Sequence, residues 1–179
     1  MKELNLGAGP DIREGFDNQD YKKFRGINLV FNLESKKWPI KDNTYDFVLC
    51  NHVVEHIKGI FEFFNEIHRI CKPNAMIKIE VPHYSTNFAF TQIDHKHYFG
   101  LDSLTILESK DFQNKTKPFK VVSQRILWRG EKSSRIMQAI ASPINTLINS
   151  SHSFQLFVDR FLSKIIPFYF MEYIIKVEK

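Results

Sequence analysis

The sequence has few of the features that mark several large protein classes. It contains only two cysteines among 179 residues, and both lie in apolar segments, so reduced thiols in a cytoplasmic protein are expected rather than disulfides. The longest apolar tract, "IIPFYFM" (165–171), is far shorter than the ~20 residues of a membrane-spanning helix. The N-terminus carries no basic region followed by an apolar core, so no signal peptide is expected. Basic residues are scattered despite a net charge of +5, which argues against a nucleic-acid partner.

The composition is that of a folded, water-soluble domain. With 43% hydrophobic and 25% charged residues, the chain has the balance of a globular protein and not of a disordered one. Its length suits a single domain over residues 1–179.

Hydrophobic patterning predicts an α/β fold. The segment "YDFVLCN" (45–51) is almost continuously apolar, as in a strand of a parallel sheet that is buried on both faces. In contrast, "GIFEFFNEIHRICKP" (59–73) repeats apolar residues at helical spacing and ends at a proline. The other expected elements are strands at 3–6, 15–20, 26–33, 75–82, 119–129 and 170–179, a short helix at 101–109 with Asp102 as its N-cap, and helices at 133–150 and 153–166.

Small and polar residues follow each of the first four expected strands. In a parallel sheet the carboxyl ends of the strands share one edge, where ligands of open α/β sheets bind. Glycines allow close approach of the backbone to a ligand, and an acid can accept hydrogen bonds from ribose hydroxyls. A nucleoside-sized ligand is therefore expected at this edge. The residues in question are Gly7-Ala8-Gly9, Asp20, Asn32-Leu33 and Asn51-His52.

Three stretches carry a family resemblance. They are "LNLGAGP" (4–10), "WPIKDNTYDFVLCNHVVEHI" (38–57) and "EIHRICKPNAMIKIEVP" (66–82). Over about residues 3–105 the chain resembles the class I S-adenosylmethionine-dependent methyltransferases of the methyltransferase type 11-like kind. The resemblance implies a Rossmann-like, mostly parallel sheet with an antiparallel C-terminal strand. It also implies a cofactor-binding half at 1–105 and a C-terminal half at 106–179 that contains a helical insertion at 133–166.

The resemblance also implies a role for each residue at the sheet edge. Gly7, Ala8 and Gly9 would form the loop under the methionine moiety of S-adenosylmethionine, and Asp20 would bind the ribose hydroxyls. Asn32 and Leu33 would flank the adenine, and Asn51 and His52 would face the sulfonium.

The chain departs from the family pattern in the first loop. Only 11 residues separate Gly9 from Asp20, so the first helix should be shortened or absent. Asn5 replaces the acid of the first strand, although its amide can still hydrogen-bond the loop, and Asp11 stands where the family has a third glycine. These departures keep open the alternative of a catalytically inactive binding or scaffold protein with a methyltransferase fold.

The segment "HVVEH" (52–56) also matches the H-x-x-E-H pattern of inverted zinc proteases. On a helix, this spacing would place His52 and His56 on one face. A catalytic zinc ion needs a third protein ligand, and the segment here follows a buried strand in a methyltransferase context. We therefore expect no metal, and interpret Glu55 and His56 as packing and hydrogen-bonding residues.

The long segment "PHYSTNFAFTQIDHKHYF" (82–99) should overhang the same edge and contact the methyl acceptor. A hydroxyl acceptor profits from a base with a pKa near 7, which His83 or His95 could supply, with Asp94 as an orienting partner. By family analogy the acceptor is a small molecule or a glycan-type hydroxyl, as in polysaccharide biosynthesis. No Asn/Asp-Pro-Pro-Tyr/Phe motif follows the strand at 45–51 to hold a flipped base, so a nucleic-acid acceptor is not expected.

The C-terminal segment 153–166 has an apolar stripe at helical spacing. Such a stripe most simply packs over the sheet or against a second copy of the chain, which would give a homodimer. Peripheral membrane contact is the other interpretation, supported by nearby basic and aromatic residues. The stripe consists of Phe154, Phe157, Val158, Phe161, Leu162 and Ile165.

Overall fold

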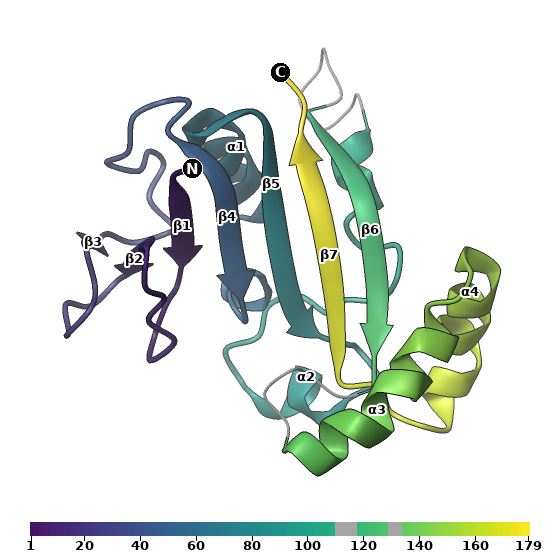
Figure 1. Cartoon of the computed structure of the whole chain (residues 1–179). Helices are drawn as coiled ribbons and strands as arrows, with labels where there is room; N and C mark the ends of the chain where they lie inside the picture. Colours follow the sequence, from purple (N-terminus) through teal and green to yellow (C-terminus); the bar gives the residue numbers. More distant parts are fainter. Residues whose placement is uncertain (110–117, 129–133) are drawn as a thin grey trace.

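One seven-stranded sheet organises the protein, with strand order β3-β2-β1-β4-β5-β7-β6 (Figure 1). The computed structural model describes residues 1–109, 118–128 and 134–179. The last residue of the expected strand at 119–129 and the first residue of the expected helix at 133–150 lie outside these ranges. The strands are β1 (Glu3–Leu6), β2 (Phe16–Asp20), β3 (Leu29–Val30), β4 (Tyr45–Asn51), β5 (Cys71–Pro82), β6 (Phe119–Leu127) and β7 (Phe170–Val177).

The strand directions confirm the predicted fold class. Strands β1 to β5 pair in parallel, whereas β7 runs antiparallel to both β5 and β6. The β5–β7 pairing is long and regular, running from Met76 opposite Lys176 to Pro82 opposite Phe170. The sheet is therefore Rossmann-like and mostly parallel, with an antiparallel C-terminal strand.

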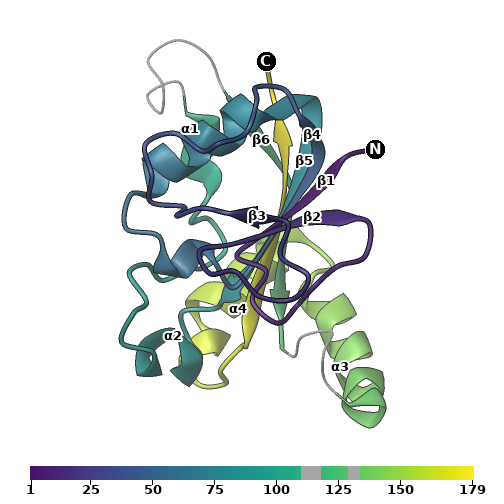
Figure 2. The same ribbon diagram turned by 90° about the vertical axis from the view of Figure 1, so that its left-hand side faces the viewer.

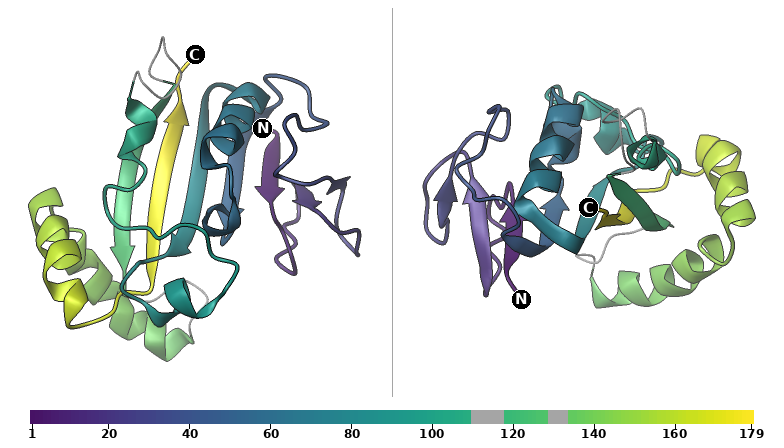
Figure 3. Two further views of the ribbon diagram at one scale, coloured as in Figure 1. Left: turned by 180° about the vertical axis from the view of Figure 1, so that it is seen from behind. Right: turned by 90° about the horizontal axis from the view of Figure 1, so that it is seen from above.

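Helix α1 (Ile60–Ile70) covers one face of the central strands (Figure 3). Its apolar side chains Phe63, Phe64 and Ile67 are fully buried, and so are the alternate residues Ile77 and Ile79 of β5. The helix ends at Ile70, and β5 begins at the next residue, four positions earlier than expected. Seen along the sheet, α1 and α2 (Asn87–Thr91) lie on one side and α3 (Arg135–Ile148) lies on the other, near the carboxyl ends of the parallel strands (Figure 2).

The connection between β1 and β2 contains no helix in its described residues 7–15, as predicted. Buried amide side chains hold it instead. Asn5 donates from Nδ2 to the carbonyl of Asp11 (2.7 Å) and to Oδ1 of Asn18 (3.0 Å). Asn18 in turn donates to the carbonyl of Arg13 (2.9 Å). These hydrogen bonds satisfy the buried amide side chains and two carbonyl groups of the loop. They hold the connection in place without a helix.

The C-terminal half adds α3, α4 (His152–Arg160) and the 3₁₀ turn η4 (Leu162–Lys164) beside the β6 edge. None of the helices in the described part of the chain has the length and apolar character to cross a membrane. The predicted helix at 101–109 is instead a 3₁₀ turn, η2 (Thr105–Glu108). Asp102 accepts hydrogen bonds from Thr105 through its backbone carbonyl, so the prediction of a side-chain N-cap is wrong.

Candidate cofactor and active site

A cavity of about 430 Å³ opens at the carboxyl ends of β1, β2 and β4. Its volume lies within the range of about 300–1,000 Å³ that small-molecule sites occupy. Gly7, Asp20, Asn32, Leu33 and His52, all predicted from the sequence to bind the cofactor, line it together. The other lining residues are Gln19, Tyr21, Glu34, Val53, His56, Ile57 and Asp94.

Gly7 makes the tight turn that opens this cavity. Its φ of +58° lies in the left-handed region, which side chains other than glycine rarely adopt. A Cβ atom at this position would lie 2.6 Å from Cγ2 of Val53. Both the backbone conformation and the packing therefore require glycine here.

The carboxylate of Asp20 is held at the end of β2 by two backbone N–H groups. Oδ2 accepts from Gly9 and Oδ1 accepts from Lys22, each at 3.0 Å. The residue is only 7% exposed. These bonds tie the glycine loop to β2 and fix the direction in which the carboxylate faces the cavity.

Gln19 is a cavity residue that the sequence reasoning missed. The side chain is fully buried, accepts from the N–H of Gly7 at 3.0 Å through Oε1, and donates from Nε2 to the carbonyl of Phe31 at 2.6 Å. It thus links the β1 loop to the segment that carries Asn32 and Leu33. The only sequence signal was an unusually polar strand, "FDNQD".

Four other predicted cofactor residues are not among those lining the cavity. Asn5 and Ala8 are buried, and Gly9 donates its N–H to Asp20. Asn51 directs its amide toward Oδ2 of Asp11 at 3.5 Å. The direct contact of these four residues with a cofactor stays a prediction.

His52 lies at the end of β4 between two carboxylates. Its Nδ1 is 3.3 Å from Oε1 of Glu55, and its Nε2 is 3.5 Å from Oε1 of Glu80. Partial burial lowers the pKa of His52, but the two carboxylates outweigh it and raise the pKa to about 9. The imidazole is therefore protonated near neutral pH and cannot act as a base there.

The predicted acceptor segment contributes Asp94 and His95 to this region. Asp94 lines the cavity, and its Oδ2 lies 3.1 Å from Nδ1 of His56. The rings of His56 and His95 are 4.7 Å apart. The structure thus brings Asp94 and His95 together around His56, which sequence reasoning had treated as a packing residue.

His83 is not brought to the cavity. Its side chain is fully buried, with Nδ1 bonded to the Ser85 hydroxyl (2.8 Å) and Nε2 to Oδ1 of Asp159 on α4 (3.0 Å). Asp159 also accepts from the N–H of Leu101 at 3.2 Å. His83 therefore holds the acceptor segment against the C-terminal helices.

The zinc-protease arrangement of "HVVEH" does not form. Val54–His56 is a single 3₁₀ turn, and His52 before it has a φ of +53°, so His52 and His56 do not share a helix face. Glu55 instead pairs with His52, as described above.

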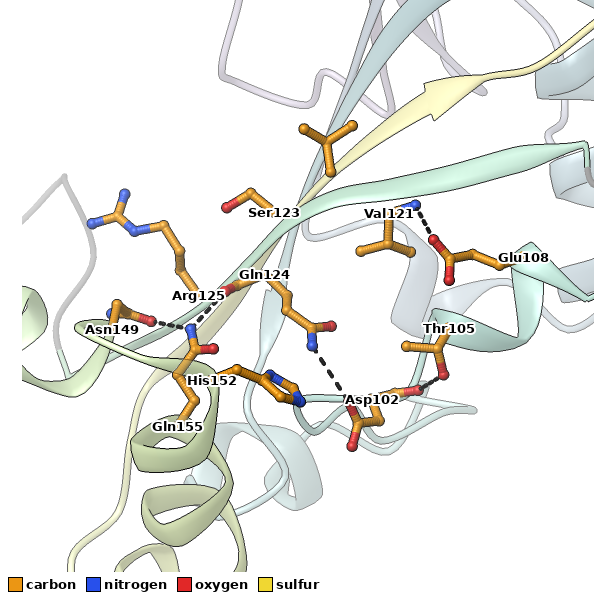
Figure 4. A pocket seen from close by; sticks show the side chains of 11 residues that line it. Asp102, Thr105, Glu108, Val121, Ser123, Gln124, Arg125, Asn149, His152 and Gln155 are labelled. Atoms are coloured by element: carbon orange, nitrogen blue, oxygen red, sulfur yellow. Dashed lines mark hydrogen bonds between the residues drawn. The ribbon is translucent and has the colours of Figure 1, made fainter.

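A larger cavity of about 560 Å³ lies at the other end of the sheet, against β6 (Figure 4). Polar side chains from η2, β6 and α4 line it, and several bond one another, such as Gln124 with Asp102 at 3.3 Å. It contains none of the residues predicted to bind the cofactor. It is therefore separate from the site at the carboxyl ends of β1, β2 and β4.

The sheet and the cavity define a class I methyltransferase fold. Residues 8–79 match the model of a family described as methyltransferase domain. The fold and this match over part of the chain support a class I methyltransferase with S-adenosylmethionine as its cofactor, as the sequence predicted. No curated protein sequence matches the chain.

Solved structures with the same fold cover almost the whole chain. A SAM-dependent methyltransferase from Archaeoglobus fulgidus is 19% identical with a TM-score of 0.58, covering 99% of this chain and 86% of that one. A Haemonchus contortus phosphoethanolamine N-methyltransferase 2, solved with S-adenosyl-L-methionine, is 16% identical with a TM-score of 0.58, covering 99% and 49%. The [4+2]-cyclase SpnF is 10% identical with a TM-score of 0.59, covering 99% and 74%.

Proposed function

We propose that the protein binds S-adenosylmethionine in the 430 Å³ cavity and transfers its methyl group to a small-molecule or glycan-type hydroxyl. The observation that carries this proposal is the convergence of Gly7, Asp20, Asn32 and Leu33 on one cavity at the carboxyl ends of the strands. They come from three separate segments, at the ends of β1, β2 and β3, and their chemistry suits a nucleoside with a zwitterionic tail. A cytoplasmic location and a part in polysaccharide biosynthesis are further predictions, the first supported by two buried free thiols.

The reaction needs alignment more than covalent help from the protein. Bound S-adenosylmethionine would supply an electrophilic methyl group, which an acceptor oxygen would take in line with the breaking carbon–sulfur bond while the hydroxyl proton passes to a base. His52 is protonated and cannot take that proton. Asp94 lines the cavity next to His56 and His95, so we assign proton acceptance to this group, without His83.

A non-catalytic or differently catalytic protein is the alternative. The structure of SpnF, described as a [4+2]-cyclase, has the same fold, so the fold by itself does not fix the reaction. Cofactor binding is the first property that separates a methyltransferase from a scaffold.

Calorimetry with S-adenosylmethionine and S-adenosylhomocysteine tests the proposal. We expect saturable binding of both, and an affinity lowered by about tenfold or more in Asp20→Ala, because a charge-assisted hydrogen bond contributes about 1.5–3 kcal/mol. Asp17→Ala is the matched control, since Asp17 lies on the same strand and bonds the Tyr45 hydroxyl outside the cavity.

Folded wild-type protein that binds neither compound at millimolar concentration would contradict the methyltransferase proposal and favour the scaffold alternative. Equal affinities in Asp20→Ala and Asp17→Ala would show that Asp20 does not hold the ribose. Because Asp20 also bonds Gly9 and Lys22, circular dichroism must first establish that each variant is folded.

The apolar stripe of the C-terminal segment is divided in the structure. Val158 is buried, whereas Phe157, Phe161 and Ile165 are 46%, 61% and 80% exposed. We propose that these exposed side chains form a homodimer contact, with peripheral membrane binding as the alternative. Phe161→Ser should convert a dimer to a monomer in sedimentation experiments. A wild-type monomer that sediments with anionic vesicles would favour the membrane instead.

A further inference from the structure

Two histidines and a glutamate meet beside the cofactor cavity. Glu55 and His56 lie in the 3₁₀ turn after β4, and His95 lies in the segment after α2. One potential ligand atom from each of the three lies within 4.8 Å of the others. Imidazole nitrogens and a carboxylate oxygen are the donors that zinc and other divalent transition metals bind.

A backbone carbonyl orients the ring of His95. Its Nδ1 lies 3.0 Å from the carbonyl oxygen of Ala89, which can only accept a hydrogen bond. In the neutral imidazole Nδ1 therefore carries the proton, and Nε2 has the lone pair that can bind a metal ion. A backbone carbonyl that fixes the second nitrogen in this way is a usual companion of metal-binding histidines. The residue is 8% exposed, so water reaches it poorly.

Glu55 has a buried oxygen that lacks a hydrogen bond. The residue is 1% exposed, and Oε1 pairs with His52 at 3.3 Å. Among the described residues, Oε2 has no hydrogen-bond partner. A carboxylate oxygen buried without a partner is destabilising, and a cation at this point would remove that penalty.

The backbone fixes the two halves of the cluster to each other. The N–H groups of Lys96 and His97 both donate to the carbonyl of Glu55, at 2.7 and 3.3 Å. These bonds place His95 over the turn that carries Glu55 and His56, although 39 residues separate the two histidines in the chain. Asp94 adds a further carboxylate 3.1 Å from His56, on the side that faces the cavity.

We propose that Glu55, His56 and His95 bind a divalent transition-metal ion, with Asp94 beside them, at the wall of the cofactor cavity. An ion with metal–nitrogen distances of about 2.0–2.1 Å would draw the three donor atoms closer together by about 1 Å. This site revises the expectation that the chain binds no metal, and it replaces the His52–His56 pair suggested by "HVVEH" with a different partner, His95.

The position of the ion at the cavity wall suits activation of the methyl acceptor, an inference that rests on the proposed methyl transfer. An ion with three protein ligands would keep a coordination position open for a further ligand. An acceptor hydroxyl bound there would lose its proton more readily, because the cation stabilises the alkoxide. The ion would thereby take over part of the task assigned above to a protein base.

Metal binding can be tested without the cofactor. Full-length protein stripped with EDTA is titrated with ZnCl₂ by calorimetry and, in parallel, with CoCl₂ followed by visible absorption. We expect one ion per chain, and an affinity lowered by about 100-fold or more in His56→Ala and in His95→Ala. His152→Ala is the control, because His152 is an exposed histidine on α4 that lines the separate cavity against β6.

Wild-type protein that takes up no zinc, or zinc binding that is equal in His56→Ala, His95→Ala and His152→Ala, would overturn the metal site. If a histidine variant does not fold, Glu55→Gln and the cobalt spectrum of the wild type provide the test. Titration of the EDTA-treated protein with S-adenosylhomocysteine keeps the two proposals apart. Cofactor binding without metal binding defeats only the metal site, and metal binding without cofactor binding defeats only the methyltransferase proposal.

Discussion

Replacing Gly7 by alanine is expected to abolish measurable cofactor binding and to destabilise the protein by roughly 2–5 kcal/mol. Two separate penalties add at this residue. A φ of +58° disfavours any side chain, and the added Cβ would lie 2.6 Å from Cγ2 of Val53. Relief of either strain moves the loop that lines the cavity. Urea unfolding and calorimetry with S-adenosylhomocysteine measure the two effects.

Gly9→Ala is the matched control, because it carries only one of the two penalties. Gly9 has a similar φ of +50°, but the nearest atom to its Cβ position is 3.9 Å away. We therefore expect a smaller destabilisation of about 1–2 kcal/mol. In a Gly7→Ala/Val53→Ala double variant, the part of the destabilisation that comes from the clash with Val53 should be absent. If Gly7→Ala and Gly9→Ala unfold alike, the contact with Val53 does not determine the choice of glycine.

Replacing Arg69 by methionine is expected to destabilise the protein by about 3–5 kcal/mol, as breaking a largely buried ion pair does. Arg69 on α1 binds both carboxylate oxygens of Glu66, at 2.7 and 2.6 Å. It also donates to the backbone carbonyls of Trp38 and Ile40, and so holds the segment before β4 against the helix. Urea unfolding of Arg69→Met measures the loss.

Lys72→Met provides the comparison. Lys72 pairs with Asp46 at 2.9 Å, but both side chains are partly exposed, so its loss should change the unfolding free energy by less than about 1 kcal/mol. A loss of that small size in Arg69→Met as well would show that the Arg69 contacts do not hold the segment in solution.

The Glu66–Arg69 pair also gives the stability a defined acid dependence. Burial raises the pKa of Glu66, but the hydrogen bonds from Arg69 and from the Trp38 N–H outweigh it and hold the pKa below its usual range. A carboxyl with a lowered folded-state pKa stabilises the protein above its unfolded-state pKa, near 4.3, and that contribution is lost as the pH falls through the folded value. The decline of the unfolding free energy below about pH 4.3 should therefore be smaller in Glu66→Gln.

Much of the fold could be predicted because it depends on periodic burial. The continuous apolar run of β4 and the helical spacing of α1 both appear in the sequence, and both elements form where expected. The length of the connection between β1 and β2 predicted a first helix that is shortened or absent, and the described residues contain none. What replaced the helix could not be predicted, because Asn5 and Asn18 are held by specific partners and no periodicity reports those.

In the candidate site, too, some residues could be predicted from the sequence and others could not. Gly7 directly follows β1 and Asp20 ends β2, so their place at the sheet edge followed from the strand assignments. The pairing of His56 with His95 depends on how a long segment folds back through Lys96 and His97, which local sequence does not encode. The motif "HVVEH" pointed to the wrong partner because the left-handed conformation of His52 breaks the helix it assumes.

The short edge strand β3 has a consequence for the energetics of binding. It consists of Leu29–Val30 alone, paired only with Gln19 and Asp20, and the described residues on its other side provide no further strand. Backbone hydrogen bonds at such an edge open at low free energy and exchange rapidly with solvent. Asn32 and Leu33 follow this strand after one intervening residue, Phe31, so a nucleoside bound against them would have to order this edge of the sheet. Part of its intrinsic affinity is thereby offset by ordering entropy, and substitutions that stiffen β3 would tighten binding without adding a contact.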